Sequence, residues 1–558
     1  MVDRSGGRRK TTPKLGCRTG PPSVFACGWA AAFLGCLQAN RESDEMTIRR
    51  RTIGKGLAAS ALSIPGLLGN NPAQAQRAQD TLRLVFRDAV SNIDPYFNSQ
   101  RTGLILGHQA WDGLVHRDPE SFRVVPALAT EWRWVNPLLL EFTLRRGVKF
   151  HDGSDFTARD AVYTINTVSN PDTRVAVPSN YAWIDRAEAE GDFKLRLHLK
   201  RPTPAALDYL ALVVPIWPQA YRERVGMEGF SRAPIGTGPY RITKFDVAGG
   251  VEYERFDGYY EGGPKGKPAI RRMTARFVTD AATELTELLA QRVDWIWNMN
   301  PDQVANVSRL PFLQTLRQES MRIGYLSLDA AGRSGDNPMK HLKVRQAVWH
   351  ALDRTTIAER LVTGGSRVPV APCYPSQFGC NADAAMQYTY NPDKAKQLLA
   401  EAGFPNGFDI ELTSYVQPRQ WSEAVQSYLQ AVGIRARLNL LQVAAQTQRA
   451  WRGELAMSMG SWGSYSINDV SALLPNFFGG GNDDYARDAE LQRLLEEGGS
   501  SADEEVRNAA YSGAIKRITE QAYWVPLHTY VNTYAFQRQL DFKAFPDELP
   551  RFYLAKWK

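Results

Sequence analysis

The segment LEFTLRRGVKFHDGSDFTARDAVYTINTV, residues 140–168, contains one predicted strand and one predicted helix separated by a polar turn. Residues 140–145 alternate apolar and polar side chains, which is the pattern of a half-buried β-strand. Thr157 precedes a run whose apolar residues recur at helical spacing, and threonine is favoured at helix N-termini. Gly147 and Gly153 fit the turn between the two elements. A strand that leads directly into a helix favours an α/β or α+β fold.

The same two patterns recur along the rest of the chain. Residues 81–86, 193–199, 251–256 and 408–415 alternate like strands, and residues 283–292 and 344–357 have helical spacing. With 558 residues, 43% of them hydrophobic, the chain can bury a large core and should hold more than one domain. No fixed repeat and no long linker is visible, so we expect two or three α/β lobes that pack together. The Gly- and Pro-rich runs at 233–240 and 261–268 are candidate crossings between lobes.

The formal charge of +8 is concentrated at the N-terminus. Residues 1–76 hold 11 Lys and Arg against 4 Asp and Glu, which leaves 56 basic and 55 acidic residues in the remainder. A near-neutral body lacks the basic face that nucleic-acid binders need. The sequence therefore argues against a nucleic-acid partner.

Residues 46–75 contain the three parts of an export signal. A basic cluster at 49–51 is followed by an apolar stretch of 13 residues at 56–68 and by Ala73-Gln74-Ala75. Because a membrane-spanning helix needs about 20 apolar residues, we expect cleavage near Ala75 and a periplasmic protein. The arginine pair before Thr52 and Ile53 resembles a twin-arginine signal, and a Sec leader with extra arginines is the alternative.

Residues 1–45 do not fit an export signal that begins at Met46. We expect Met46 to be the true start and residues 1–45 to be a non-native or disordered extension. A second apolar anchor at 24–37 is the alternative, although its 14 residues are short for a membrane span.

Cys373 and Cys380 are the two cysteines that follow the leader. Two cysteines that lie seven residues apart in an exported protein predict a local disulfide. Zinc is the competing interpretation, but no second Cys or His pair lies near them in sequence.

The usual short catalytic signatures are absent. The sequence has no HExxH, GxSxG or GxxxxGK[ST] motif, and Gly236-Thr237-Gly238 is followed by Pro239 where a dinucleotide-binding helix would begin. His151 and Asp152 are sequence neighbours, which rarely face each other. We therefore predict no catalytic residue, no metal ligand and no cofactor. Because catalytic triads assemble from distant residues, a secreted α/β hydrolase is the alternative function.

Several short segments of the sequence, taken together, resemble a known protein family. They are NIDP (92–95), WDGL (111–114), VPALATEW (125–132), FTLRRGVKFHDG (142–153), FTARD (156–160), GTGPY (236–240), VRQA to ALDR (344–354) and KAKQLLAEAG (394–403). In this order they resemble the extracytoplasmic solute-binding proteins of ABC transporters, specifically family 5, the dipeptide/oligopeptide/nickel-binding type. The runs cover nearly the whole chain after the leader.

The resemblance implies a periplasmic binding protein-like α/β fold with two α/β lobes and an additional inserted lobe. The expected boundaries are 76–112, 235–320 and 520–558 for lobe I, 113–234 for the inserted lobe II and 321–519 for lobe III. The implied function is the periplasmic solute-binding component of an ABC importer. Such a protein, expected to be a monomer without its own reaction, closes on a peptide or another small polar solute and delivers it to the transmembrane permease subunits.

The segment MGSWGSYSIND (459–469) is the predicted specificity site. In peptide-binding members of the family, a tryptophan here is followed closely by an aspartate that pairs with the peptide's α-ammonium. Trp462 is present, but Ser464 and Tyr465 occupy the place of that aspartate, and the next acid is Asp469. Loss of a charge-assisted hydrogen bond costs about 1.5–3 kcal/mol, so ordinary peptide binding is in doubt.

A sugar-like, opine-like or other small polar ligand fits this segment as well as a peptide does. The ligand would stack on Trp462, and its other predicted contacts are Ser464, Tyr465, Asn468, Asp469, Tyr415 and Arg419. Arg419 could hold a carboxylate, or it could be a solvated arginine at a helix start. Nickel binding lacks support because no His cluster or Met-rich site is visible. An envelope scaffold, which would expose apolar patches, is a third hypothesis for the function.

Overall fold

The computed structural model describes residues 80–416 and 419–558, which lie in the compact unit Gly69–Lys558. The predicted extension over 1–45 and the predicted export signal over 46–75 lie outside these residues. Within the described part, none of the helices is long and apolar enough to cross a bilayer.

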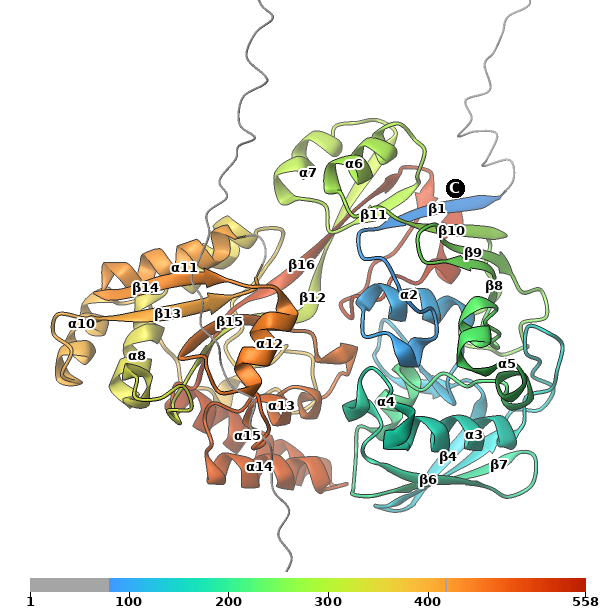
Figure 1. Ribbon diagram of the computed structural model, residues 1–558, viewed down its shortest axis with the longest axis horizontal. Helices are drawn as coiled ribbons and strands as arrows, with labels where there is room; N and C mark the ends of the chain where they lie inside the picture. The colour runs from blue at the N-terminus through green and yellow to red at the C-terminus, as the bar shows by residue number, and fades with distance from the viewer. Residues whose placement is uncertain (1–79, 417–418) are drawn as a thin grey trace, which may run out of the picture. The chain divides into compact units, whose positions relative to one another are not determined.

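A ten-stranded mixed sheet extends through this unit (Figure 1). Its strands, in spatial order, are β14 (Ile434–Leu440), β13 (Phe408–Ser414), β15 (Met457–Trp462), β12 (Leu313–Leu328), β16 (Trp524–Gln537), β11 (Trp295–Trp297), β1 (Thr81–Phe86), β10 (Arg272–Phe277), β9 (Gly250–Arg255) and β8 (Tyr240–Asp246). We call β13, β14 and β15 the β15 side, and β1 with β8 to β11 the β1 side.

The long strands β12 and β16 join the two sides (Figure 1). They pair antiparallel along most of their length, and their register shifts between Glu319 and Ile323. On one side of this shift Leu313 pairs with Gln537, and on the other β12 also pairs with β15. Chain segments far apart in sequence therefore meet where β12 and β16 pass from one side to the other.

A second sheet has four antiparallel strands in the order β4 (Ala129–Asn136), β5 (Leu139–Leu144), β7 (Lys194–Leu199) and β6 (Ile184–Ala189). Helix α3 (Ala158–Ser169) follows β5, with Thr157 and Asp160 forming a reciprocal capping box at its start. The predicted strand and the predicted helix of the 140–168 segment are both present. A short hairpin joins β2 (Val115–Arg117) to β3 (Val124–Pro126).

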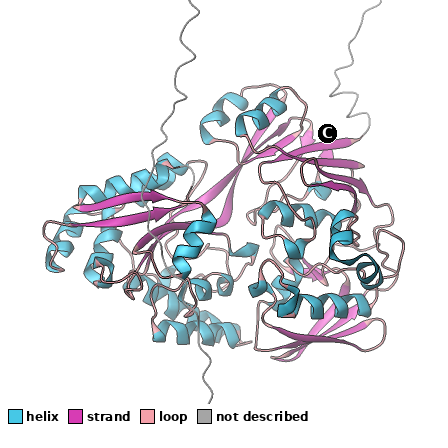
Figure 2. Cartoon of the chain, in the orientation of Figure 1, coloured by secondary structure: helices cyan, strands magenta, loops and turns pink. Residues whose placement is uncertain are grey.

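Helices lie against the strands of both sides (Figure 2). Besides α3 they are α2 (Arg101–Ala110), α4 (Ala206–Leu212), α5 (Gln219–Arg232), α6 (Ala281–Leu289), α7 (Pro301–Val307), α8 (Leu342–Ala351), α9 (Arg354–Thr356), α10 (Pro392–Glu401), α11 (Gln420–Ala431), α12 (Val443–Trp451), α13 (Leu474–Phe478), α14 (Ala489–Ser500) and α15 (Glu504–Glu520). The alternation of strands and helices confirms the predicted α/β class.

The single helix predicted over 344–357 is wrong. The structure ends α8 at Ala351, because Leu352 and Asp353 leave the helical conformation. The Asp353 side chain then accepts a hydrogen bond from the Thr356 backbone N–H and caps a new short helix, which continues as a π-helix over Ile357–Val362. An apolar period alone did not reveal this break.

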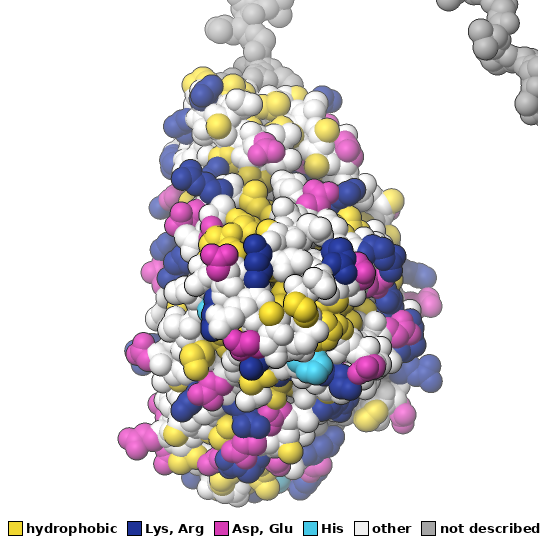
Figure 3. Space-filling view, turned by 90° about the vertical axis from the view of Figure 1, so that its left-hand side faces the viewer, with side chains coloured by type: hydrophobic (Ala, Val, Ile, Leu, Met, Phe, Trp, Pro, Cys, Tyr) yellow, Lys and Arg dark blue, Asp and Glu magenta, His cyan; other side chains and the backbone are white. Residues whose placement is uncertain are grey.

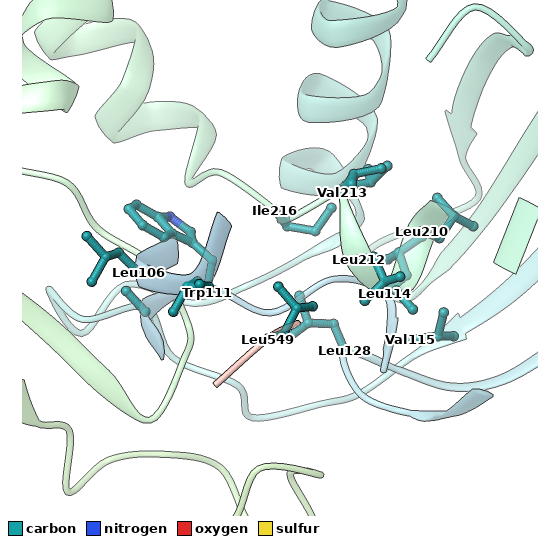
Figure 4. Packing of buried hydrophobic residues seen from close by; sticks show 14 of the residues in the cluster. Leu106, Trp111, Leu114, Val115, Leu128, Leu210, Leu212, Val213, Ile216 and Leu549 are labelled. Atoms are coloured by element: carbon teal, nitrogen blue, oxygen red, sulfur yellow. The ribbon is translucent and has the colours of Figure 1, made fainter. Parts of the chain in front are cut away.

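Four buried clusters form the core. The largest joins the β1 side to the four-stranded sheet, and two others fill the β15 side. Figure 4 shows Leu549, from the C-terminal segment, packed among Leu106, Trp111, Leu114 and Leu128. The C-terminal segment is thus fixed in the main core. The lobe boundaries 76–112, 113–234, 235–320, 321–519 and 520–558 stay a prediction.

Basic and acidic side chains are interspersed on the face shown in Figure 3, with no large patch of one sign. This face carries no stripe of the kind on which nucleic acid binders rely.

Candidate functional site

Two neighbouring cavities lie beside the junction of the two sides. The first, about 180 Å³, is lined by Pro95, Tyr96, Asn98, Ser99, Gln100, Arg101, Leu104, Val177, Asn180, Tyr181, Val213, Arg322, Trp462, Gly463 and Tyr465. The second, about 640 Å³, includes Arg87, Arg101, Trp297, Arg317, Arg322, Tyr415, Trp421, Ser461, Tyr530 and Glu548 in its wall. Because Arg101 and Arg322 border both cavities, the two guanidinium groups stand where the cavities meet.

An irregularity in β12 places Arg322 at this point. The register shift between Glu319 and Ile323 leaves Ser320, Met321 and Arg322 outside the regular ladder. Such irregularities re-aim side chains within an otherwise continuous sheet. Arg322 consequently borders both cavities instead of lying over a neighbouring strand.

Arg101 approaches from the first turn of α2, on the β1 side of the molecule. Its Nη1 donates a hydrogen bond of 2.5 Å to the Ser466 hydroxyl, and its Nη2 lies 3.4 Å from a carboxylate oxygen of Glu548. Burial lowers the pKa of Arg101, and the charge of Glu548 opposes that shift. Arg101 therefore links α2 to the loop after β15 and to the C-terminal segment.

Glu548 is the carboxylate that pairs with the positive charges of Arg101 and Arg322. Arg322 donates to it through Nε at 3.1 Å and through Nη2 at 3.0 Å, which is a bidentate pair. Burial raises the pKa of Glu548, but the charges of Arg322 and Arg101 outweigh burial and hold that pKa below its usual value. Glu548 is thus ionised in the folded protein at neutral pH.

A second, fully buried charge cluster holds the segment that carries Glu548. Asp547 accepts hydrogen bonds from Arg117 at 2.9 Å and from Arg551 at 2.6 Å, and all three side chains are at most 1% exposed. Burial disfavours the Asp547 carboxylate, but Arg551 and Arg117 together hold its pKa well below the usual value. This cluster fixes the backbone directly before Glu548.

Aromatic side chains form much of the wall of the first cavity. Trp462 and Tyr465 meet edge to face with ring centres 4.8 Å apart, and the Trp462 indole N–H donates to the Ala472 carbonyl at 2.9 Å. Tyr96 and Tyr181, 5.4 Å apart, stand in the same wall. Among the described residues that line this cavity, the charged ones are Arg101 and Arg322, and none is acidic.

The loop between Trp462 and the rest of the predicted site has an unusual backbone. Ser464, Tyr465 and Ser466 have φ values of 50°, 48° and 66°, a left-handed conformation that costs side-chain-bearing residues about 1–2 kcal/mol each. Hydrogen bonds to Ser466 stabilise this left-handed conformation. Its hydroxyl accepts from Arg101 and donates to the Asp547 carbonyl at 2.6 Å, and its carbonyl accepts from Arg117. These contacts position the Tyr465 ring in the cavity wall.

Of the seven residues predicted to contact a ligand, three line a cavity. Trp462 and Tyr465 line the first, and Tyr415 lines the second. The Tyr415 hydroxyl donates to the Ser461 carbonyl at 3.0 Å and accepts from the Ser461 N–H at 2.8 Å, so β15 holds it in place.

The other four predicted residues lie outside both linings. Ser464, within the loop, is buried. The Asn468 backbone carbonyl accepts a hydrogen bond from the Phe378 backbone N–H, and Asp469 is buried in an ion pair with Arg507 at 2.6 Å. Arg419 is exposed and pairs with Glu423, four residues further along α11, at 2.7 Å. That placement matches the solvated-arginine alternative.

Sequence reasoning missed Arg101, Arg322 and Glu548. They come from a helix start, a strand irregularity and a C-terminal turn, separated by more than 200 residues, so no local motif contains them. One signal was available: Arg322 is the one charged residue in the largely apolar segment MRIGYLSL (321–328).

The structure joins Cys373 and Cys380 by a disulfide with a Cα–Cα distance of 5.8 Å. Between them, Phe378 donates its N–H to the Asn468 carbonyl at 3.0 Å and accepts from the Val470 N–H at 3.1 Å. The closed loop therefore supports the chain that follows Trp462. No group of three or more potential metal-ligating side chains was found among the described residues.

We expect Cys373→Ser to lower the free energy of unfolding by about 2 kcal/mol under oxidising conditions, because the loop is no longer closed in the unfolded chain. Denaturant titrations of both proteins with and without reductant measure this effect. An equal difference between them in reductant would contradict a stabilising disulfide.

Comparisons with known proteins agree with this architecture. The profile of the bacterial extracellular solute-binding proteins, family 5, matches residues 123–485. Heme-binding protein A of Haemophilus influenzae is 27% identical over 454 residues, covering 75% of this chain and 81% of its own. The glutathione-binding protein GsiB of Salmonella choleraesuis is 26% identical over 490 residues, covering 85% and 91%.

Solved structures give the same result. HbpA2 from Haemophilus parasuis superposes with a TM-score of 0.74 at 25% identity, covering 86% of this chain and all of its own. The periplasmic binding protein DppA from Helicobacter pylori, in complex with the peptide STSA, has a TM-score of 0.73 at 21% identity and covers 86% and 99%. These relatives are binding proteins, and none of them supports the hydrolase alternative. The chain belongs to family 5 of the bacterial extracellular solute-binding proteins, the solute-binding components of ABC importers.

Proposed function

We propose that the protein binds a small solute bearing a carboxylate at the Arg101–Arg322 pair and delivers it to the permease of an ABC importer. The observation that carries this proposal is the position of the two guanidinium groups. They stand at the meeting point of both cavities, from α2 and from β12, beside the aromatic wall of the first cavity. The planar guanidinium group of an arginine can donate two parallel hydrogen bonds to a carboxylate.

The ligands of relatives support this solute class. Two relatives are named for binding heme and glutathione, and both of these molecules carry carboxylate groups. The first cavity has no acidic side chain among its described lining residues, so a solute ammonium placed there would lack a charge partner. We therefore favour a solute whose aromatic or apolar part enters the first cavity while its carboxylate meets the arginines.

The remaining parts of the proposal concern the protein as a component of a transport system. We propose a monomer that is exported, with its leader cleaved near Ala75, and that has no catalytic activity. The lobes are those predicted above, and closure of lobe I and lobe III around the solute would mark the loaded protein for the permease.

A thermal-shift screen of the purified protein tests the solute class. Candidate solutes are peptides, glutathione, opines, oligosaccharides and aromatic monocarboxylic acids. A ligand that binds only the folded state raises the melting temperature in a concentration-dependent manner. We expect increases with solutes that bear a carboxylate and none with neutral oligosaccharides. Increases with neutral sugars alone would contradict the proposal.

A further inference from the structure

Glu548 already occupies the place where the proposed function puts a solute carboxylate. We infer that Glu548 is an internal carboxylate that occupies the Arg101–Arg322 pair in the solute-free protein, and that a solute carboxylate replaces it there. This inference rests on the proposed function, because it concerns the same pair of arginines.

The contacts of Glu548 are those expected of a bound carboxylate. Its two oxygens accept from Arg322 at 3.1 and 3.0 Å, and one of them lies 3.4 Å from Arg101 Nη2. Glu548 also lines the second cavity together with both arginines. Its side chain is 7% exposed, against 17% for Arg101 and 27% for Arg322. A solute in either cavity therefore reaches the arginines before it reaches the backbone that carries Glu548.

The backbone at Glu548 is fixed, so exchange would require only the side chain to move. On one side Asp547 is held by Arg117 and Arg551, and on the other Leu549 is buried in the main core (Figure 4). Between these anchors Glu548 has a φ of 60°. The second cavity, about 640 Å³, offers space into which the displaced carboxylate can turn.

Gly463 shows how closely the chain surrounds this ion pair. A Cβ atom on Gly463 would lie 3.1 Å from Arg322 Nη2 and 3.3 Å from a Glu548 carboxylate oxygen. The loop that carries Trp462 and Tyr465 thus passes directly against the pair. Replacing Glu548 by another group at the two arginines would therefore change the contacts of that loop.

The charge balance sets the class of solute. Two guanidinium groups and one carboxylate leave a net charge of +1 at the junction, which one further carboxylate neutralises. After displacement Glu548 would remain nearby and would repel a second anionic group. The site should therefore select solutes that present a single carboxylate to the arginines.

Inorganic sulfate tests the inference without knowledge of the solute. In Glu548→Gln the arginines lose their internal carboxylate, so we expect sulfate to raise the melting temperature along a saturable curve whose midpoint is at least tenfold lower than in the wild type. Glu490→Gln is the matched control, because Glu490 forms an exposed bidentate pair with Arg493 at 2.9 and 3.0 Å. The sulfate midpoint of Glu490→Gln should equal that of the wild type.

Equal sulfate responses in the wild type, Glu548→Gln and Glu490→Gln would overturn the inference and leave Glu548 a permanent partner of Arg322. If Glu548→Gln does not fold, Glu548→Asp replaces it, because a side chain one methylene shorter weakens the contact while keeping the charge. Its midpoint should also fall below that of the wild type, and an unchanged midpoint would overturn the inference. Should sulfate respond as expected while no carboxylate solute binds any variant, the proposed function fails together with the carboxylate exchange, and only the occupation of the arginine pair by Glu548 stands.

Discussion

Asp547→Asn is expected to lower the free energy of unfolding by about 3–5 kcal/mol at pH 7, since it leaves Arg551 buried without its carboxylate partner and Arg117 with only the more distant Asp208, 3.9 Å away. Both guanidinium groups are at most 1% exposed, so water cannot replace the lost carboxylate. Denaturant titration measures the change. Asp409→Asn is the matched control, because Asp409 pairs with Arg435 at the surface, where such pairs contribute about 0–1 kcal/mol.

The effect of Asp547→Asn should depend on pH with a defined sign. The folded protein holds the pKa of Asp547 well below the 3.8 of an unperturbed aspartate. The unfolded chain therefore takes up a proton first as the pH falls, and the stabilisation by Asp547, complete above about pH 5, is lost as the pH falls through its folded-state pKa. The difference between wild type and variant should shrink below pH 4. A difference below 1 kcal/mol at pH 7, or one that grows in acid, would contradict the assigned cluster.

Trp462→Ala is expected to weaken binding of a carboxylate solute by about 2 kcal/mol, or ~30-fold, as truncation of a central aromatic anchor typically does. The variant removes the ring that packs edge to face on Tyr465 and on Phe477. Trp462 is only half-buried, so the fold should survive the change. Calorimetric titration of a solute found in the screen measures the loss.

Trp451→Ala is the control for that comparison. Trp451 is 52% exposed, donates its indole N–H to Asp483 at 3.1 Å and lines neither cavity. Its affinity should equal that of the wild type. If Trp462→Ala and Trp451→Ala bind equally well, Trp462 does not contact the solute and the ligand lies elsewhere.

Local signals in the sequence were sufficient for the α/β class because they are numerous, whereas the binding-protein architecture was implied by the family resemblance. The alternation over 140–145 and the cap at Thr157 each describe a few neighbouring residues, and the structure has both elements. The failure at 344–357 has the same origin. The apolar period continues across Asp353, but the aspartate side chain competes for a backbone N–H and starts a new helix.

The site could be predicted only in part because its residues meet through tertiary structure. Trp462 and Tyr465 belong to one loop, which a motif could indicate. Arg322 depends on a strand irregularity, and Glu548 on a turn held by buried arginines of other elements. Asp469 shows the converse: it looked like a ligand contact in sequence, but Arg507, 38 residues further along the chain, pairs with it.

A calorimetric comparison of one solute as its free acid and as its primary amide tests the central claim most directly. The amide keeps the shape of the solute and removes the charge that the arginines would bind. We expect the acid to bind at least tenfold more tightly, because a charge-assisted hydrogen bond is worth about 1.5–3 kcal/mol. Equal affinities for acid and amide would contradict a carboxylate site at Arg101 and Arg322.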